Sequence, residues 1–176
     1  MTPSLDLKAP VSTRDLIDYV QAGHNLMIFG DVDSRKSLRN LFNEFGADLE
    51  NVGFELRDKD QQQSLGTPDE LIFSHNFFEP LRDHSKTLFS SAHSKAEAIA
   101  FSGIGHVIDS NNQVTILFDL KFVFPILKAE DTTYSYSVEN TEVSSEVGQA
   151  LVLVSGYQTR TNQRATLSGS MSMCSN

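Results

Sequence analysis

The hydrophobic positions in the first quarter of the chain follow two helical repeats separated by one continuous apolar run. Residues 12–22 and 35–45 each repeat apolar side chains at the three- and four-residue spacing of an amphipathic helix. Residues 25–30 between them show no alternation, which is typical of a strand covered on both faces. Helix, strand and helix in close succession predict a three-layer α/β domain built around a mostly parallel sheet.

Short polar residues and glycines mark the ends of both helices. Ser12 with Asp15 three residues later predicts a capping box at the start of the first helix. Gly23 follows that helix and Gly46 follows the second, at the positions where glycine usually ends a helix. The boundaries of these elements are therefore predicted by local signals as well as by periodicity.

The middle of the chain is polar and less regular. We expect a short strand within residues 48–56 and a charged, glutamine-rich loop over residues 57–66. Short strands are predicted at 70–74, 98–101 and 106–109, the last two on either side of a bend at Gly103-Ile-Gly105. Residues 129–148 read as a surface strand and loop in which Tyr134 and Tyr136 share one face.

Near the C-terminus, two short apolar runs are joined by a polar turn. Residues 150–154 predict a buried strand and residues 165–167 a second one. Between them, four polar residues stand at every second position, so that extended backbone would place them on one face: Gln158, Arg160, Asn162 and Arg164. Such a row can bind anions, hold a partner or bond backbone carbonyls inside the domain, and we favour the last role.

Composition narrows the class of protein. Of the 176 residues, 39% are hydrophobic and 21% charged, which is ordinary for one globular domain. The net charge of −9 argues against binding to nucleic acid or to an anionic membrane surface. Asp119 and Lys121 interrupt the longest apolar run, and the N-terminus has no features of a signal peptide. Taken alone, these facts favour a cytosolic protein.

No reactive constellation stands out. Cys174, the only cysteine, follows no strand–turn–helix pattern, and the five histidines show no metal-ligand spacing, so we expect no catalytic residue, metal or cofactor. Gly103-Ile-Gly105 lacks the rest of a dinucleotide fingerprint. Asp31 and Asp33 follow a strand at the edge where α/β sheets bind ligands, yet they equally suit a turn, and we favour the turn.

Four segments carry a family resemblance: Leu16–Leu26, Phe101–His106, Ile126–Tyr136, and Gln158–Arg164 followed by Ser168-Gly-Ser170. In this order they resemble the family of the non-catalytic, membrane-anchored subunit of the oligosaccharyltransferase complex, which transfers glycans to asparagine in the endoplasmic reticulum lumen. Together they span most of residues 12–170.

The resemblance implies a Rossmann-like or glutamine-amidotransferase-like α/β domain that is incomplete at its N-terminal side. Residues 1–10 would be a lead-in loop and residues 11–176 a partial lumenal domain, from a longer protein or a truncated gene model. The implied location is the lumenal face of the endoplasmic reticulum membrane, and the implied partners are the other oligosaccharyltransferase subunits, including the catalytic one. A structural or interface role is implied for five residues: Gln158, Arg160, Asn162, Arg164 and Gly169.

The chain departs from the family pattern at three places. His24 stands where the family has glycine, which suggests a turn that carries some strain. Asp58 and Asp60 occur in a segment from which the family's histidine is missing. Residues 117–124 look like an insertion, or like a retained intron.

Two rival interpretations stay open at this point. One is a cytosolic scaffold of the intraflagellar-transport type, which shares this kind of domain. The other is a small-molecule hydrolase or transferase that uses Asp31, Asp33 and the arginines of the polar row, and it requires all of these side chains to meet in one pocket.

Overall fold

A computed structural model describes residues 11–65, 71–73, 99–108, 122–137, 139, 141–159 and 161–174. The predicted lead-in loop at 1–10 lies outside the described residues, as do Arg160 and the first five residues of the predicted insertion at 117–124. The last three residues of that insertion begin a strand, β7 (Phe122–Lys128).

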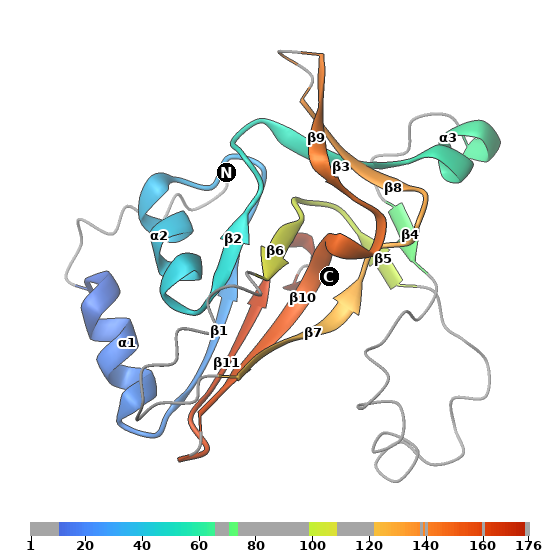
Figure 1. Cartoon of the computed structure of the whole chain (residues 1–176). Coiled ribbons are helices and arrows are strands. Elements are labelled where there is room, and N and C mark those ends of the chain that lie inside the picture. Colours follow the sequence, from blue (N-terminus) through green and yellow to red (C-terminus); the bar gives the residue numbers. More distant parts are fainter. Residues whose placement is uncertain are drawn as a thin grey trace, which may run out of the picture.

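The largest sheet is built around the C-terminal strands (Figure 1). Its order is β1 (Asn25–Phe29), β11 (Arg164–Ser168), β10 (Val152–Gln158), β6 (His106–Ile108) and β2 (Ala47–Leu49). Strand β7 also pairs with β10. The buried strand predicted at 150–154 is therefore confirmed as the central strand of the sheet.

The prediction of a mostly parallel sheet is wrong for the described residues. Only β1 and β11 run parallel, whereas β10 is antiparallel to β11, β6 and β7, and β2 is antiparallel to β6. Strands β10 and β11 follow each other through a short turn, and so short a connection can join only antiparallel neighbours. The helix–strand–helix pattern of the sequence therefore applies only to the part of the sheet around β1.

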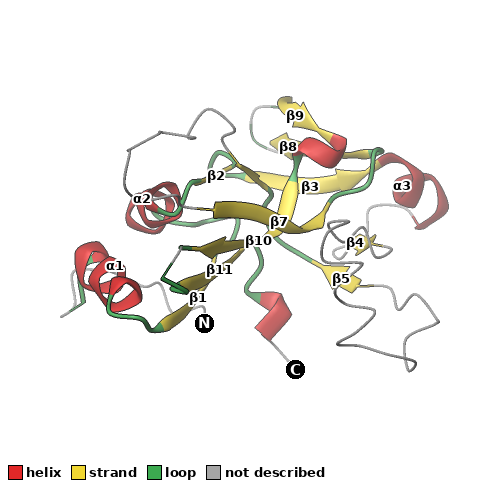
Figure 2. Cartoon of the chain, turned by 60° about the horizontal axis from the view of Figure 1, so that its bottom comes forward, coloured by secondary structure: helices red, strands yellow, loops and turns green. Residues whose placement is uncertain are grey.

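Both predicted helices are confirmed, and both pack on the same face of the sheet (Figure 2). In α1 (Thr13–Gln21), Ser12 and Asp15 form the expected capping box. In α2 (Lys36–Glu44), Leu41 and Phe42 are buried. The two helices share one core with β1, β10 and β11, whose inward residues are Ile28, Tyr157, Ala165 and Leu167.

Strand β1 corrects a second expectation. Its side chains alternate, with Ile28 buried in the core beneath the helices and Met27, on the other face, 63% exposed. The prediction that both faces of this strand are covered is therefore wrong for the described part of the chain, which has a helical layer on one face only. A continuous apolar run does not reveal which face will find a partner.

A second sheet lies beside the first and has the order β3 (Phe54–Asp58), β8 (Thr133–Ser137) and β9 (Glu142–Val147). A ribbon of β4 (Leu71–Phe73) and β5 (Ile99–Phe101) adjoins it (Figure 1). Leu56, Phe101, Leu127 and Leu153 belong to a second hydrophobic cluster between these parts. Tyr134 and Tyr136 share one face of β8, as predicted, and Arg57 lies 4.3 Å from the ring centre of Tyr136.

Helix α3 (Lys59–Leu65) stands where the sequence predicted a loop. Asp58 explains it, because its Oδ1 accepts hydrogen bonds from the backbone N–H groups of Asp60 and Gln61, both at 3.0 Å. The Oδ2 atom accepts from the hydroxyls of Thr132 and Thr133. Burial raises the pKa of this carboxyl, but the four hydrogen bonds outweigh it and hold the pKa below its ordinary value.

His106 occupies the middle of the sheet and is fully buried. Its Nε2 lies 2.8 Å from the Ser155 hydroxyl on β10, and its ring packs edge-on against Phe42, while its Nδ1 has no hydrogen-bond partner among the described residues. Burial lowers the pKa of His106 to about 3, so the ring is neutral in the folded protein at physiological pH.

Two of the resembling segments cross at Gly103 and Gly169. Ile104 N–H donates to Gly169 O at 2.9 Å, and Gly169 N–H donates to Leu153 O at 3.2 Å. A Cβ built on Gly169 would overlap Ile104 O, and one built on Gly103 would overlap Gly169 O. Only residues without a side chain let the two backbones approach so closely.

Serines and one isoleucine complete this glycine crossing. Ser170 Oγ donates to Ser102 O, and Ser172 Oγ donates to the same carbonyl at 3.2 Å. Ile104, between the two glycines of its segment, is fully buried in the core under α1 and α2. The crossing therefore connects the end of β11 to the β5–β6 segment and to the main core.

We expect Gly169→Ala to lower the free energy of unfolding by roughly 3 kcal/mol, because the crossing must open to admit the methyl group. Gly53→Ala is the control for the opposite case, since Gly53 has a left-handed φ of 81° but no described atom within 4 Å of an added Cβ, whereas Gly169 is absent from the residues with positive φ. It should cost only about 1 kcal/mol. Urea unfolding measures both, and equal losses would contradict the steric role of the crossing.

We also expect acid to destabilise the fold through His106. Its pKa is lower folded than unfolded, so the unfolded chain binds the proton first and stability is lost as pH falls from about 6.5 toward 3. The loss from this one group reaches about 2 kcal/mol at pH 5. Comparing unfolding of His106→Gln with the unaltered chain isolates it, because the other titrating groups cancel. Parallel stability–pH curves for the two chains would rule it out.

Candidate interaction site at the β10–β11 turn

The polar row forms a tight turn, as the two flanking strands require. Strand β10 ends at Gln158 and β11 begins at Arg164, and these two residues are partners across the antiparallel pair. Thr159 N–H donates to Gln163 O at 3.0 Å, and Asn162 has a left-handed φ of 69°. The expectation that the row lies along one face of extended backbone is therefore wrong, because the chain reverses within it.

Asn162 nevertheless brings three of the four predicted residues together. Its Oδ1 accepts from Gln158 Nε2 at 3.3 Å and from Arg164 Nε and Nη2 at 3.1 and 2.7 Å. Asparagine tolerates the left-handed conformation better than most residues, so one side chain both shapes the turn and orients the guanidinium. Arg160, the fourth residue of the row, lies outside the described residues.

The intervening residues anchor the turn to the rest of the domain. Thr159 Oγ1 donates to Gln163 Oε1 at 2.8 Å and accepts from Gln163 N–H at 3.2 Å. Gln163 Nε2 in turn donates to Gln21 O, in the last turn of α1. No pattern in the sequence indicates this contact, because it joins residues 142 positions apart.

Arg164 offers a cation to the surroundings. Its side chain is exposed, and among the described residues no carboxylate lies within ion-pairing distance of it. Asn162 engages Nε and Nη2, which leaves further N–H groups free to donate. In a chain of net charge −9, this oriented guanidinium is suited to a carboxylate or carbonyl on another surface.

His24 follows α1, the helix that Gln163 contacts, and it shows no sign of strain. Gly23 carries the left-handed conformation, with φ 98°, whereas His24 is absent from the residues with positive φ. The ring of His24 stacks on Tyr19 with centroids 4.4 Å apart. The expected cost of replacing the family's glycine is thus not observed.

Asp31 and Asp33 belong to a turn, as we favoured. Asp31 Oδ1 accepts from Val32 N–H, and Ser34 Oγ accepts from Asp31 N–H at 2.6 Å. Asp31 follows the end of β1, whereas Arg164 is paired with Asn25 at the start of that strand. Five residues of strand separate the two ends by about 16 Å, so these groups form no common pocket.

The described residues contain no other obvious reactive centre. The buried His106–Ser155 pair has no path to a substrate, since both side chains are fully enclosed. No group of three metal-binding side chains converges in the described part of the chain. Among the same residues, no helix is long and apolar enough to cross a bilayer.

Comparison with solved structures shows the fold. The mmIFT52 N-terminal domain superposes with a TM-score of 0.57, covering 92% of this chain and 60% of the other at 11% sequence identity. At that identity, the likeness extends to the fold alone.

Sequence comparison is more specific. The chain is 25% identical over 173 residues to the dolichyl-diphosphooligosaccharide–protein glycosyltransferase 48 kDa subunit of Drosophila melanogaster and 26% identical over 171 residues to that of Caenorhabditis elegans. It is 28% identical over 172 residues to subunit wbp1 of the same glycosyltransferase in Schizosaccharomyces pombe.

These alignments cover 92%, 94% and 92% of this chain, which spans only about a third of its relatives' length (34%, 36% and 34%). The family model described as OST48, N-terminal domain, matches residues 2–176. The chain therefore belongs to the OST48 N-terminal domain family.

Proposed function

We propose that this chain acts as part of a non-catalytic subunit of the oligosaccharyltransferase complex and supports protein N-glycosylation at the endoplasmic reticulum membrane. The observation that carries the proposal is the family match over residues 2–176. The names of the relatives, all subunits of dolichyl-diphosphooligosaccharide–protein glycosyltransferase, supply the complex. The domain belongs on the lumenal face of the membrane, where glycan transfer to asparagine takes place.

We further propose that residues 11–176 are part of a Rossmann-like or amidotransferase-like domain. Among the described residues, strand β1 is the terminal strand of the main sheet, and it runs parallel to β11. Its outward face carries Met27, 63% exposed. In a longer protein, a further parallel strand along β1, with a helix over Met27, would produce the layered arrangement that the sequence predicted.

The β10–β11 turn is the proposed contact with another subunit, the catalytic subunit among the candidates. Gln158, Asn162 and Arg164 form a preorganised polar group on the surface, and Arg160 stands between Gln158 and Asn162 in the sequence. A guanidinium that is already oriented loses little side-chain freedom on binding. Gly169 has a different proposed role, inside the domain, where it permits the glycine crossing.

The two rival functions have less support. The likeness to the mmIFT52 N-terminal domain rests on shape, whereas the oligosaccharyltransferase relatives are similar in sequence over nearly the whole chain. A small-molecule hydrolase that uses Asp31 and Arg164 needs both in one site, and they stand at opposite ends of the β1–β11 pair. The accessory role is therefore the better proposal.

We expect Arg164→Ala, placed in the full-length parent protein, to weaken its co-purification with the other subunits several-fold. Stability should change by less than about 0.5 kcal/mol, because the side chain is exposed. Arg14→Ala is the control, since Arg14 on α1 is also exposed and, among the described residues, pairs with Asp18 at 3.9 Å. Unchanged co-purification of Arg164→Ala, or an equal loss with Arg14→Ala, would argue against a contact at the turn.

The accessory role itself is tested by activity. The purified chain should transfer no glycan from a lipid-linked oligosaccharide to an acceptor peptide, while cells depleted of the parent protein should underglycosylate a reporter glycoprotein. Transfer by the purified chain that a point mutation abolishes would contradict the proposal. So would full glycosylation of the reporter after depletion.

A further inference from the structure

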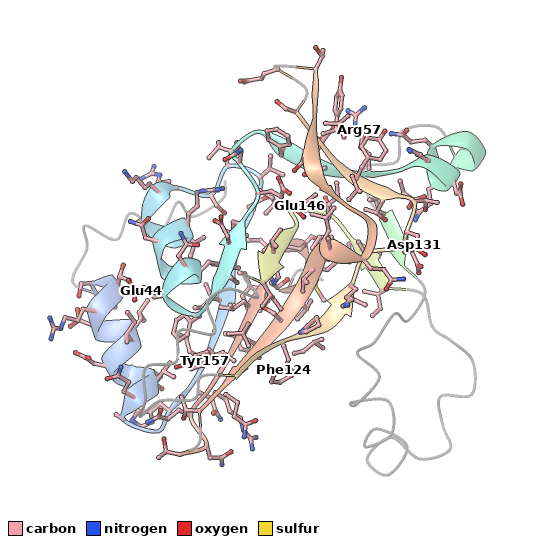
Figure 3. The ribbon with its side chains drawn as sticks, in the orientation of Figure 1. Glu44, Arg57, Phe124, Asp131, Glu146 and Tyr157 are labelled. Atoms are coloured by element: carbon pink, nitrogen blue, oxygen red, sulfur yellow. The ribbon has the colours of Figure 1, made fainter. Side chains whose placement is uncertain are left out.

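A polar pocket of about 630 Å³ lies at the opposite end of the sheet order from β1, between α2, the edge strand β2 and β9. Six polar residues among its lining are Arg39, Asn43, Asp48, Glu50, Ser144 and Glu146. Glu146 comes from β9, on the side of that strand toward β2 and β6 in Figure 3. Neither the resembling segments nor the β10–β11 turn contributes to this pocket.

The positively charged residue in the described lining of the pocket, Arg39, is already hydrogen-bonded to the backbone. Arg39 donates from Nη1 to Glu50 O and from Nη2 to Leu49 O, so its guanidinium covers backbone carbonyls of the sheet edge. Asn43 stands one helical turn later. When its amide is turned so that the oxygen and the nitrogen are both satisfied, its nitrogen donates to Ala47 O at 3.0 Å. These two side chains occupy the edge of β2, where a further strand could otherwise pair.

Glu50 is the unusual member of the pocket. Its side chain is only 8% exposed, and its Oε1 accepts one hydrogen bond, from Ser144 Oγ at 2.9 Å. Its Oε2 has no hydrogen-bond partner among the described residues. Burial raises the pKa of Glu50, and the Glu146 and Asp48 carboxylates raise it further against the opposing effects of Ser144 and Arg39. A nearly buried carboxylate thus lines a pocket in which Arg39 is the one cation among the described lining residues, and the guanidinium of Arg39 is held on backbone carbonyls.

We propose that this pocket binds a guanidinium or ammonium side chain, Arg or Lys, on a basic peptide segment of a partner. Three carboxylates, Asp48, Glu50 and Glu146, line the cavity, against one guanidinium that is bound to the backbone. The described residues do not bring these carboxylates together as a metal site. The cavity is large enough for a long side chain, and an organic cation with several N–H groups can reach separated oxygen atoms.

This inference is independent of the proposed oligosaccharyltransferase role, because it depends only on the pocket. It also predicts how a substitution of Glu50 changes the stability of the chain when no cation is bound. Without a cation, the buried carboxylate of Glu50 opposes folding, so replacing it with the neutral amide should raise the melting temperature. A residue that merely supports the fold would have the opposite effect.

The probe is the tripeptide acetyl-Gly-Arg-Gly-amide, titrated into the isotopically labelled 176-residue chain and followed by NMR. Its neutral counterpart, with citrulline in place of arginine, keeps the shape and removes the charge. We expect the arginine peptide to shift the amide signals of Glu50 and Glu146 in a saturable way, and the citrulline peptide to bind at least tenfold more weakly. A parallel titration with spermidine distinguishes a free polyamine from a peptide side chain as the better source of the cation.

Glu50→Gln and Glu146→Gln should each weaken binding of the arginine peptide at least tenfold, and Glu50→Gln should also melt at a higher temperature. Glu44→Gln is the matched control, since Glu44 is an exposed acid on α2 outside the pocket lining (Figure 3). It should bind the peptide as the unaltered chain does. Equal binding of the two peptides, undiminished binding by Glu50→Gln, or a lower melting temperature for that variant would overturn the proposal.

Discussion

The close approach of two backbones at Gly103 and Gly169 is the constraint on which the rest of the structure depends. It places Ile104 in the core beneath α1 and α2, and it ties the end of β11 to Leu153 on β10. Because the contact leaves no room for a Cβ on either residue, packing around it is set by the main chain. The glycines in two of the resembling segments thus have a physical reason that concerns folding, separate from any contact with a partner.

Different parts of the chain therefore have different roles. The glycine crossing and the buried His106–Ser155 contact hold the sheet together from within. The β10–β11 turn displays an oriented guanidinium on the surface. At the β2 edge, Arg39 does what the sequence led us to expect of the polar row, since it bonds backbone carbonyls with a planar fork. The role favoured for the polar row itself stays a prediction, because Arg160 lies outside the described residues.

Local signals predicted local structure well. Helices α1 and α2 were predicted from capping at Ser12, from the helical repeats and from the stops at Gly23 and Gly46. Strands β1 and β10 were predicted from the apolar runs. The direction of the strands was not predictable in this way, because it depends on which segments become neighbours. Helix α3 has no apolar stripe to detect and begins at the cap provided by Asp58. The contact from Gln163 to α1 and the pocket around Glu50 join residues far apart in sequence, where no periodicity applies.

Native-state hydrogen exchange at the glycine crossing tests this account most directly. The amide of Ile104, bonded to Gly169 O, and the amide of Gly169, bonded to Leu153 O, should exchange only when the whole domain unfolds. Their protection free energies should then equal the global free energy of unfolding and match those of amides in the middle of β10. If both exchange through local opening while β10 stays protected, the crossing is peripheral to the fold and the account is wrong.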